Sequence, residues 1–76
     1  MKIFARTLTR KSYELDVASS MTVAELKEEL YKKSHMDKKD MILIFSGVKM
    51  LEAKTLAELG VTKEGAVINL IFQLAG

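Results

Sequence analysis

The strongest constraint on this chain is that it must hold a fold of 76 residues together by packing alone. It has no cysteine and a single histidine, His35, so neither a disulfide nor a cysteine–histidine metal site is available to it. Chains below roughly 70–80 residues often need such additions, because a small domain buries only about 60% of the surface exposed when unfolded. The hydrophobic fraction of 49% must therefore build one dense core, and we expect residues 1–76 to form a single domain.

Charge and hydropathy exclude several classes of function. The 12 basic and 10 acidic residues give a net charge of +2, which is too small to predict nucleic-acid binding. The longest apolar segment, residues 66–72, is interrupted by Asn69 and is much shorter than the roughly 20 residues of a membrane span. The first residues lack the apolar run of a signal peptide. We therefore expect a monomer of the cytoplasm or nucleus that binds neither nucleic acid nor membranes.

The first third of the chain has the pattern of a β-hairpin. Residues 1–7 are rich in strand-forming types, with Ile3 and Ala5 on one face, and a polar connection follows at residues 8–11. The next segment alternates apolar and polar residues, and its apolar members are Tyr13, Leu15 and Val17.

One amphipathic helix follows the hairpin. Thr22 is placed to cap its N-terminus, and Glu25 three residues later completes a capping box, worth about 0.5–2 kcal/mol. The helix should end near Ser34 and His35. Its apolar stripe consists of Val23, Leu26 and Leu30.

The remainder of the chain predicts further strands. Residues 41–45 form an apolar run of strand length, a short strand is expected around residues 49–51, and a turn near residues 56–59. A final strand should run to about Phe72. This order of elements predicts an α+β fold in which a mixed sheet of about five strands packs on one helix.

Several segments are similar, at matching spacing, to those of a known family. These are residues 1–9 (MKIFARTLT), 43–47 (LIFSG), 55–56 and 63–64. Together they resemble the ubiquitin family from end to end, without a gap up to about Val61. The resemblance implies a β-grasp fold and a protein that works as a binding surface or a tag. Neither the resemblance nor the residues indicate a catalytic group, a cofactor or a metal site, so we do not expect an enzyme.

The register of the last strand is open to two alignments. Without a gap, Asn69 would lie in the core and Ile68 at the surface, because a shift of one residue exchanges the two faces of a strand. One extra residue between Thr62 and Ala66 instead turns the apolar residues inward. Burying an unpaired amide costs about 1–3 kcal/mol, so we expect this second register, with Ile68, Leu70 and Phe72 inside.

The resemblance implies an exposed apolar patch on the sheet through which partners such as ubiquitin-binding domains are recruited. The alternative is that Ile44 and Ile71 are ordinary core residues, but Leu8, in a polar turn, favours an exposed surface. Ile42 and Val48 replace basic residues of the family, which makes this surface less basic. The matching patch residues are Leu8, Ile44, Gly47, Asn69 and Ile71.

A second functional hypothesis concerns the C-terminal tail. The family's tail is conjugated to targets through a terminal glycine by activating and conjugating enzymes. Here Gln73 and Ala75 stand where the family has arginines, which favours a plain domain boundary over a covalent modifier. We expect a flexible tail, made of Gln73, Leu74, Ala75 and Gly76.

Four lysines match acceptor lysines of the family, although solubility and ion pairing are the favoured explanation for them. By analogy, Lys27 should pair with Glu52. Val48 stands in place of the lysine whose chains lead to the proteasome, so recognition by the proteasome is a weaker expectation. The candidate acceptors are Lys11, Lys27, Lys33 and Lys63.

Overall fold

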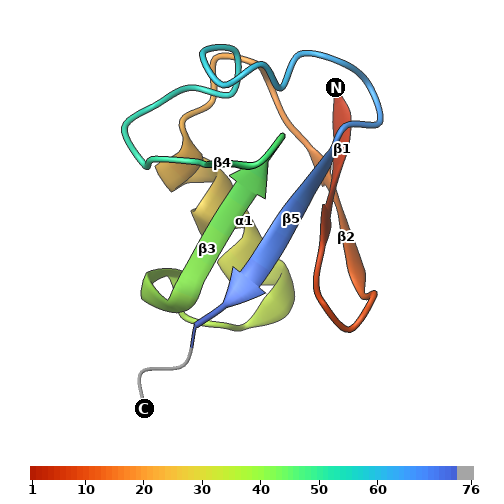
Figure 1. The fold of residues 1–76 in the computed structure, drawn as a ribbon, viewed down its shortest axis with the longest axis vertical. Helices are drawn as coiled ribbons and strands as arrows, with labels where there is room; N and C mark the ends of the chain where they lie inside the picture. Colours follow the sequence, from red (N-terminus) through yellow and green to blue (C-terminus); the bar gives the residue numbers. More distant parts are fainter. Residues whose placement is uncertain (74–76) are drawn as a thin grey trace.

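The computed structural model describes residues 1–73 and contains five strands, one α-helix and one short 3₁₀ helix, η1 (Figure 1). The predicted α+β architecture is confirmed: the strands form one mixed sheet in the order β2-β1-β5-β3-β4. The elements are β1 (Lys2–Arg6), β2 (Ser12–Asp16), α1 (Val23–Ser34), η1 (Lys38–Asp40), β3 (Met41–Phe45), β4 (Val48–Lys49) and β5 (Val67–Phe72).

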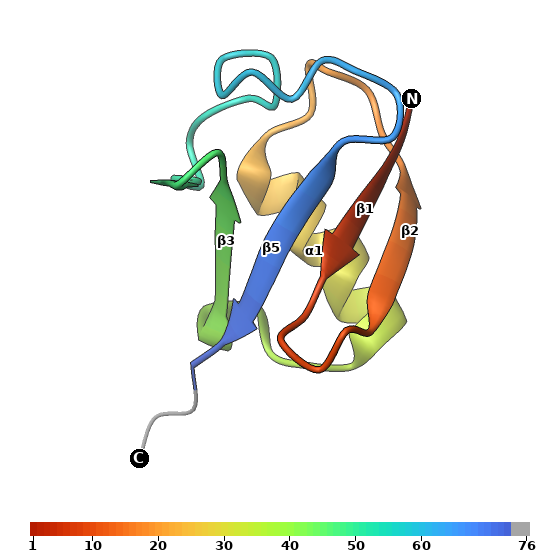
Figure 2. The ribbon, with the colours of Figure 1, turned by 45° about the vertical axis from the view of Figure 1, so that its right-hand side comes forward.

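The last strand occupies the middle of the sheet. β5 runs parallel to β1 and antiparallel to β3, so it joins the β1–β2 hairpin to the β3–β4 hairpin. Helix α1 lies behind these strands, and within residues 1–73 no other helix or strand covers the face turned toward the viewer in Figure 2. The sheet therefore has an inner face, which packs on α1, and an outer face, which is open.

The register of β5 is the one with the extra residue before the strand. Ile68 and Leu70 are fully buried and pair with Ala5 and Leu43, whereas Asn69 is exposed. The preceding turn makes room for this residue: Gly65 adopts a positive φ of 82°, and its N–H donates to the carbonyl of Lys2. Phe72 is half-buried and packs against the core.

The helix boundaries confirm the capping prediction. The side chain of Thr22 accepts a hydrogen bond from the backbone of Glu25, whose carboxylate in turn accepts one from the backbone N–H of Thr22. At the other end, His35 has the left-handed conformation, with φ 62°, and its N–H donates to the carbonyl of Tyr31. The helix thus begins and ends where the sequence places it.

The bounds predicted for the fourth strand are wrong. The strand covers Val48–Lys49 and not residues 49–51. Met50 is buried, and its N–H still donates to the carbonyl of Leu43. Leu51 then accepts a hydrogen bond from Lys54 in a turn, and this turn ends the strand early.

Candidate interaction surface

The outer face of the sheet is defined by alternation along β3 and β5. Successive side chains of a strand point to opposite faces. Because Leu43 and Leu70 are buried against the helix, their neighbours point outward. The register places Ile44 beside Asn69. It also places Ile42 beside Ile71. These two cross-strand pairs form the centre of the surface.

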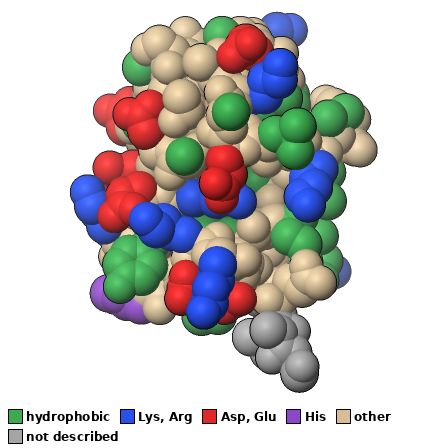
Figure 3. Space-filling model, turned by 90° about the vertical axis from the view of Figure 1, so that its left-hand side faces the viewer, with side chains coloured by type: hydrophobic (Ala, Val, Ile, Leu, Met, Phe, Trp, Pro, Cys, Tyr) green, Lys and Arg blue, Asp and Glu red, His purple; other side chains and the backbone are tan. Residues whose placement is uncertain are grey.

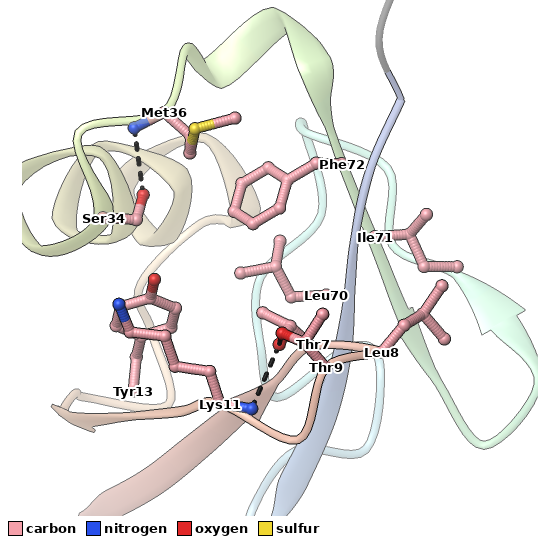
Figure 4. Close-up of a pocket in the computed structure, with 10 residues that line it drawn as sticks. All are labelled: Thr7, Leu8, Thr9, Lys11, Tyr13, Ser34, Met36, Leu70, Ile71 and Phe72. Carbon is pink, nitrogen blue, oxygen red and sulfur yellow. Dashed lines mark hydrogen bonds between the residues drawn. The ribbon is translucent and has the colours of Figure 1, made fainter.

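The structure brings the predicted patch residues to this open side of the sheet. Leu8, in the β1–β2 turn, is 84% exposed, and Figure 4 shows its side chain beside Ile71, on the side of β5 away from Phe72. Asn69 is exposed, whereas Ile44 is half-buried, as is Ile71. Gly47 is also exposed and lies in the β3–β4 turn with φ 77°. We call this set, Leu8, Ile44, Gly47, Asn69 and Ile71, the outer patch.

The conformation of the β1–β2 turn explains why Leu8 points away from the core. Thr7 donates from its backbone to the carbonyl of Lys11 at 2.8 Å, and Arg10 donates to the carbonyl of Thr7 at 3.0 Å. The hydroxyl of Thr7 accepts a second hydrogen bond from the N–H of Lys11. These contacts close a tight turn with Leu8 at its exposed side.

Two further apolar residues, Ile42 and Val48, adjoin the outer patch, and both stand where the family has basic residues. Ile42 is half-buried and faces Ile71 across the sheet. Val48, in β4, is 57% exposed. The signal that identifies Ile42 is its spacing of two residues from Ile44, since such residues share one face of a strand.

A cleft of about 380 Å³ lies beside the outer patch, between the β1–β2 turn and the C-terminal end of α1 (Figure 4). Its interior is lined by the side chains of Met36, Leu70 and Phe72, and the ammonium group of Lys11 lies 5.3 Å from the centroid of the Tyr13 ring at its edge. Leu8 and Ile71 belong both to this cleft and to the outer patch.

The candidate acceptor lysines have different surroundings. Lys11, Lys33 and Lys63 are exposed, whereas Lys27 is buried. The predicted ion pair of Lys27 with Glu52 is confirmed, with 3.1 Å between Nζ and Oε1. Its burial and this partner do not support a role for Lys27 as an acceptor.

Only the first residue of the predicted tail lies within the described residues. The backbone N–H of Gln73 donates to the carbonyl of Asp40 at 2.7 Å, so this residue is attached to the domain. The rest of the predicted tail, Leu74, Ala75 and Gly76, lies outside the described residues.

The acidic groups with shifted pKa values lie away from the outer patch and serve caps and ion pairs. Hydrogen bonds from Thr22 lower the pKa of Glu25, and those from Thr55 lower the pKa of Glu58. Glu28 accepts a hydrogen bond from Lys38, which lowers the pKa of the carboxyl and raises that of the amine. The pair of Glu28 and Lys38 joins η1 to α1.

Residues 1–73 hold no group of three or more histidine, cysteine or acidic side chains arranged to bind a metal ion. In the same range, no helix combines the length and the apolar character needed to cross a bilayer.

A mixed sheet of five strands packed on one helix defines a β-grasp domain. A model of the ubiquitin family matches residues 3–74. The chain is 30% identical over all 76 residues to the ubiquitin-like protein NEDD8 of Dictyostelium discoideum, of which it covers 97%. Over 71 residues it is 28% identical to the UV excision repair protein RAD23 homolog of the same organism, of which it covers 21%. The chain belongs to the ubiquitin family and is a non-catalytic protein.

Proposed function

We propose that this chain is a ubiquitin-like interaction domain that recruits protein partners through the outer patch. The observation that carries the proposal is the pair of half-buried isoleucines, Ile44 and Ile71, with Leu8 beside them. They lie on a sheet face that no helix or strand of the described residues covers. An apolar surface with a polar border is typical of a site for protein partners. Asn69, next to Ile44, supplies a hydrogen-bonding group within it.

The free energy available at this surface comes mainly from Leu8 and the two isoleucines. Fully burying an exposed leucine contributes about 1.5–3 kcal/mol, and Leu8 is 84% exposed in the free chain. Ile44 and Ile71 are already half-buried and contribute less each. A partner that covers all three gains several kcal/mol, from which the entropy cost of association is subtracted. We therefore expect reversible recruitment.

The test is an NMR titration of the isotope-labelled chain with a panel of ubiquitin-binding domains. We expect amide shifts at Leu8, Ile44, Gly47 and Ile71, and loss of binding in the Ile44→Ala variant while its spectrum stays folded. Val67→Ala is the matched control, because Val67 is an exposed aliphatic residue of β5 outside the outer patch. Shifts confined to other surfaces, or equal loss of binding in both variants, would contradict the proposal.

A second candidate function is that of a covalent modifier joined to targets through Gly76. It is supported by the similarity over the full length of the chain to a relative named as a ubiquitin-like protein, NEDD8. Lys11, Lys33 and Lys63 are the exposed candidates for chain formation.

This second function is tested by incubating the chain with ATP and a panel of ubiquitin-like activating and conjugating enzymes. A thioester at Gly76, absent in a chain that lacks this residue, supports conjugation. If no enzyme of the panel forms this thioester, the interaction domain remains the better-supported function.

A further inference from the structure

The end of the β1–β2 hairpin carries positive charge without a nearby acidic residue. Residues 5–13 contain Arg6, Arg10 and Lys11 and no aspartate or glutamate. The face shown in Figure 3 is different, because Lys and Arg side chains alternate there with Asp and Glu. Elsewhere in the chain, acidic and basic side chains also pair, as Glu29 and Lys32 do on helix α1.

The acidic groups of the hairpin are engaged at its opposite end. Glu14 lies 3.7 Å from the ammonium group of Lys2, and Asp16 lies 3.5 Å from the N-terminal amine. In the described part of the chain, neither Arg6 nor Arg10 has a carboxylate within ion-pairing distance. Both guanidinium groups therefore retain their full capacity for an anionic ligand.

The fold directs these two arginines to one hollow. Arg6 lies directly opposite Ser12 in the antiparallel register, so both side chains emerge on the outer face. Arg10 has a left-handed backbone, φ 66°, and the hydrogen bond of its N–H to Thr7 fixes the turn that carries it. The hollow is lined by Arg6, Thr7, Leu8, Arg10 and Ser12.

The hollow is continuous with the outer patch. Leu8 belongs to both, and Arg6 pairs in register with Asn69, which pairs with Ile44. Neighbouring strands are about 4.8 Å apart, so Arg6 lies roughly 10 Å from Ile44 along one cross-strand row. A helix spans that distance in about seven residues.

We infer that this hollow receives a carboxylate-bearing segment of the protein partner that docks on the outer patch. The inference rests on the proposed function and specifies its partner: an apolar segment with a cluster of glutamates or aspartates about two helical turns away. Guanidinium groups bind carboxylates through two parallel hydrogen bonds. Ser12 adds a hydroxyl donor at the wall.

The experiment uses two synthetic peptides of about 20 residues, long enough as helices to span some 30 Å. Both carry one leucine stripe, and one carries a terminal cluster of glutamates where the other has glutamines. Each is titrated into the isotope-labelled chain. Amide shifts at Ile44 and Ile71 report on the outer patch, and shifts at Arg6, Arg10 and Ser12 report on the hollow.

We expect the glutamate peptide to shift the hollow amides and to bind about five- to tenfold more tightly than the glutamine peptide at low salt. The Arg6→Gln/Arg10→Gln variant should lose that preference. The Lys32→Gln/Lys54→Gln variant, which also lowers the net charge from +2 to 0, should keep it, because both lysines are exposed and lie outside the hollow.

Equal binding of the two peptides, or equal loss of the preference in both variants, would overturn the inference. Hollow shifts without outer-patch shifts would uphold the anion site and contradict the proposed function instead. A single-stranded oligonucleotide that shifts the hollow amides at lower concentration than the glutamate peptide would also overturn it, because the anion would then be a phosphate.

Discussion

The two faces of β3 both carry aliphatic side chains, but these side chains differ in burial and in their cross-strand partners. Leu43 is buried beneath the sheet, whereas its neighbour Ile44 lies half-buried on the outer face. Leu43 pairs with Leu70 across an apolar interior, and Ile44 pairs with the polar Asn69. Residue type alone therefore does not separate core from interaction surface. The difference lies in whether another element covers the side chain.

The largest expected effect comes from truncating the inner face. Leu43→Ala should lower the free energy of unfolding by about 2–5 kcal/mol, since it removes buried methyl groups and leaves a cavity. Denaturant unfolding followed by circular dichroism measures this change. A loss below that of Ile44→Ala would contradict the assignment of the two faces.

The next effect concerns binding and not stability. Ile44→Ala should lower the affinity for a ubiquitin-binding domain about tenfold or more, because the largest losses on truncation come from residues at the centre of an interface. The free energy of unfolding of this variant should fall by only about 1 kcal/mol, because truncating a half-buried side chain removes less buried apolar surface than truncating a fully buried one. Isothermal titration calorimetry and denaturant unfolding of the same sample separate the two quantities.

A smaller effect is expected when the polar member of the outer row is made apolar. Asn69→Leu should change the free energy of unfolding by no more than about 0.5 kcal/mol, because the side chain is exposed. Ile68→Asn, one position away, should lower the free energy of unfolding by about 1–3 kcal/mol, since its amide would be buried. Thermal melts of the two variants should therefore diverge, and similar melting temperatures would place the strand in the other register.

The smallest expected effect is the pH dependence that a surface carboxylate, Glu25, adds to the stability of the chain. Hydrogen bonds from Thr22 lower the pKa of Glu25 below its usual 4.5. Because the folded pKa is the lower one, this contribution is present above about pH 4.5 and is lost as the pH falls through the folded value. Glu25→Gln keeps a hydrogen-bonding side chain without a titrating proton. Its urea midpoint should fall less than that of the unmodified chain between pH 6 and pH 3, and an equal fall would contradict this account.

Local signals predicted much of the fold. The capping box and the inward side of β5 follow from residue types at fixed spacing. The limit of such signals is visible in two similar segments, residues 22–26 (TVAEL) and 55–59 (TLAEL), which pair through a bridge between Thr22 and Thr55.

Both segments form the same reciprocal hydrogen bonds between threonine and glutamate, but only the first continues as a helix. The second ends after one turn, where Gly60 adopts a positive φ of 85°. Lys27 follows the first segment, whereas Gly60 follows the second. The prediction of a turn near residues 56–59 is thus confirmed.

The candidate site was less accessible from sequence. Each outer-patch residue came from the resemblance, whereas Ile42 and Val48 were named only as departures from it. The hollow is lined by residues 6–12 alone and depends on the conformation of the β1–β2 turn, including the left-handed Arg10. The cleft depends on how this turn lies beside β5 and the end of α1, which involves contacts between distant parts of the chain. No local pattern records such contacts.

The central position of β5 also bears on how this chain is made. Its ladder partners, β1 and β3, are synthesised well before it, and without β5 the sheet is reduced to two separate hairpins. An isolated two-stranded hairpin is at best marginally stable in water. On the ribosome, the sheet thus has to wait for residues 67–72, and until they emerge the inner face of each hairpin is the surface that a chaperone meets first.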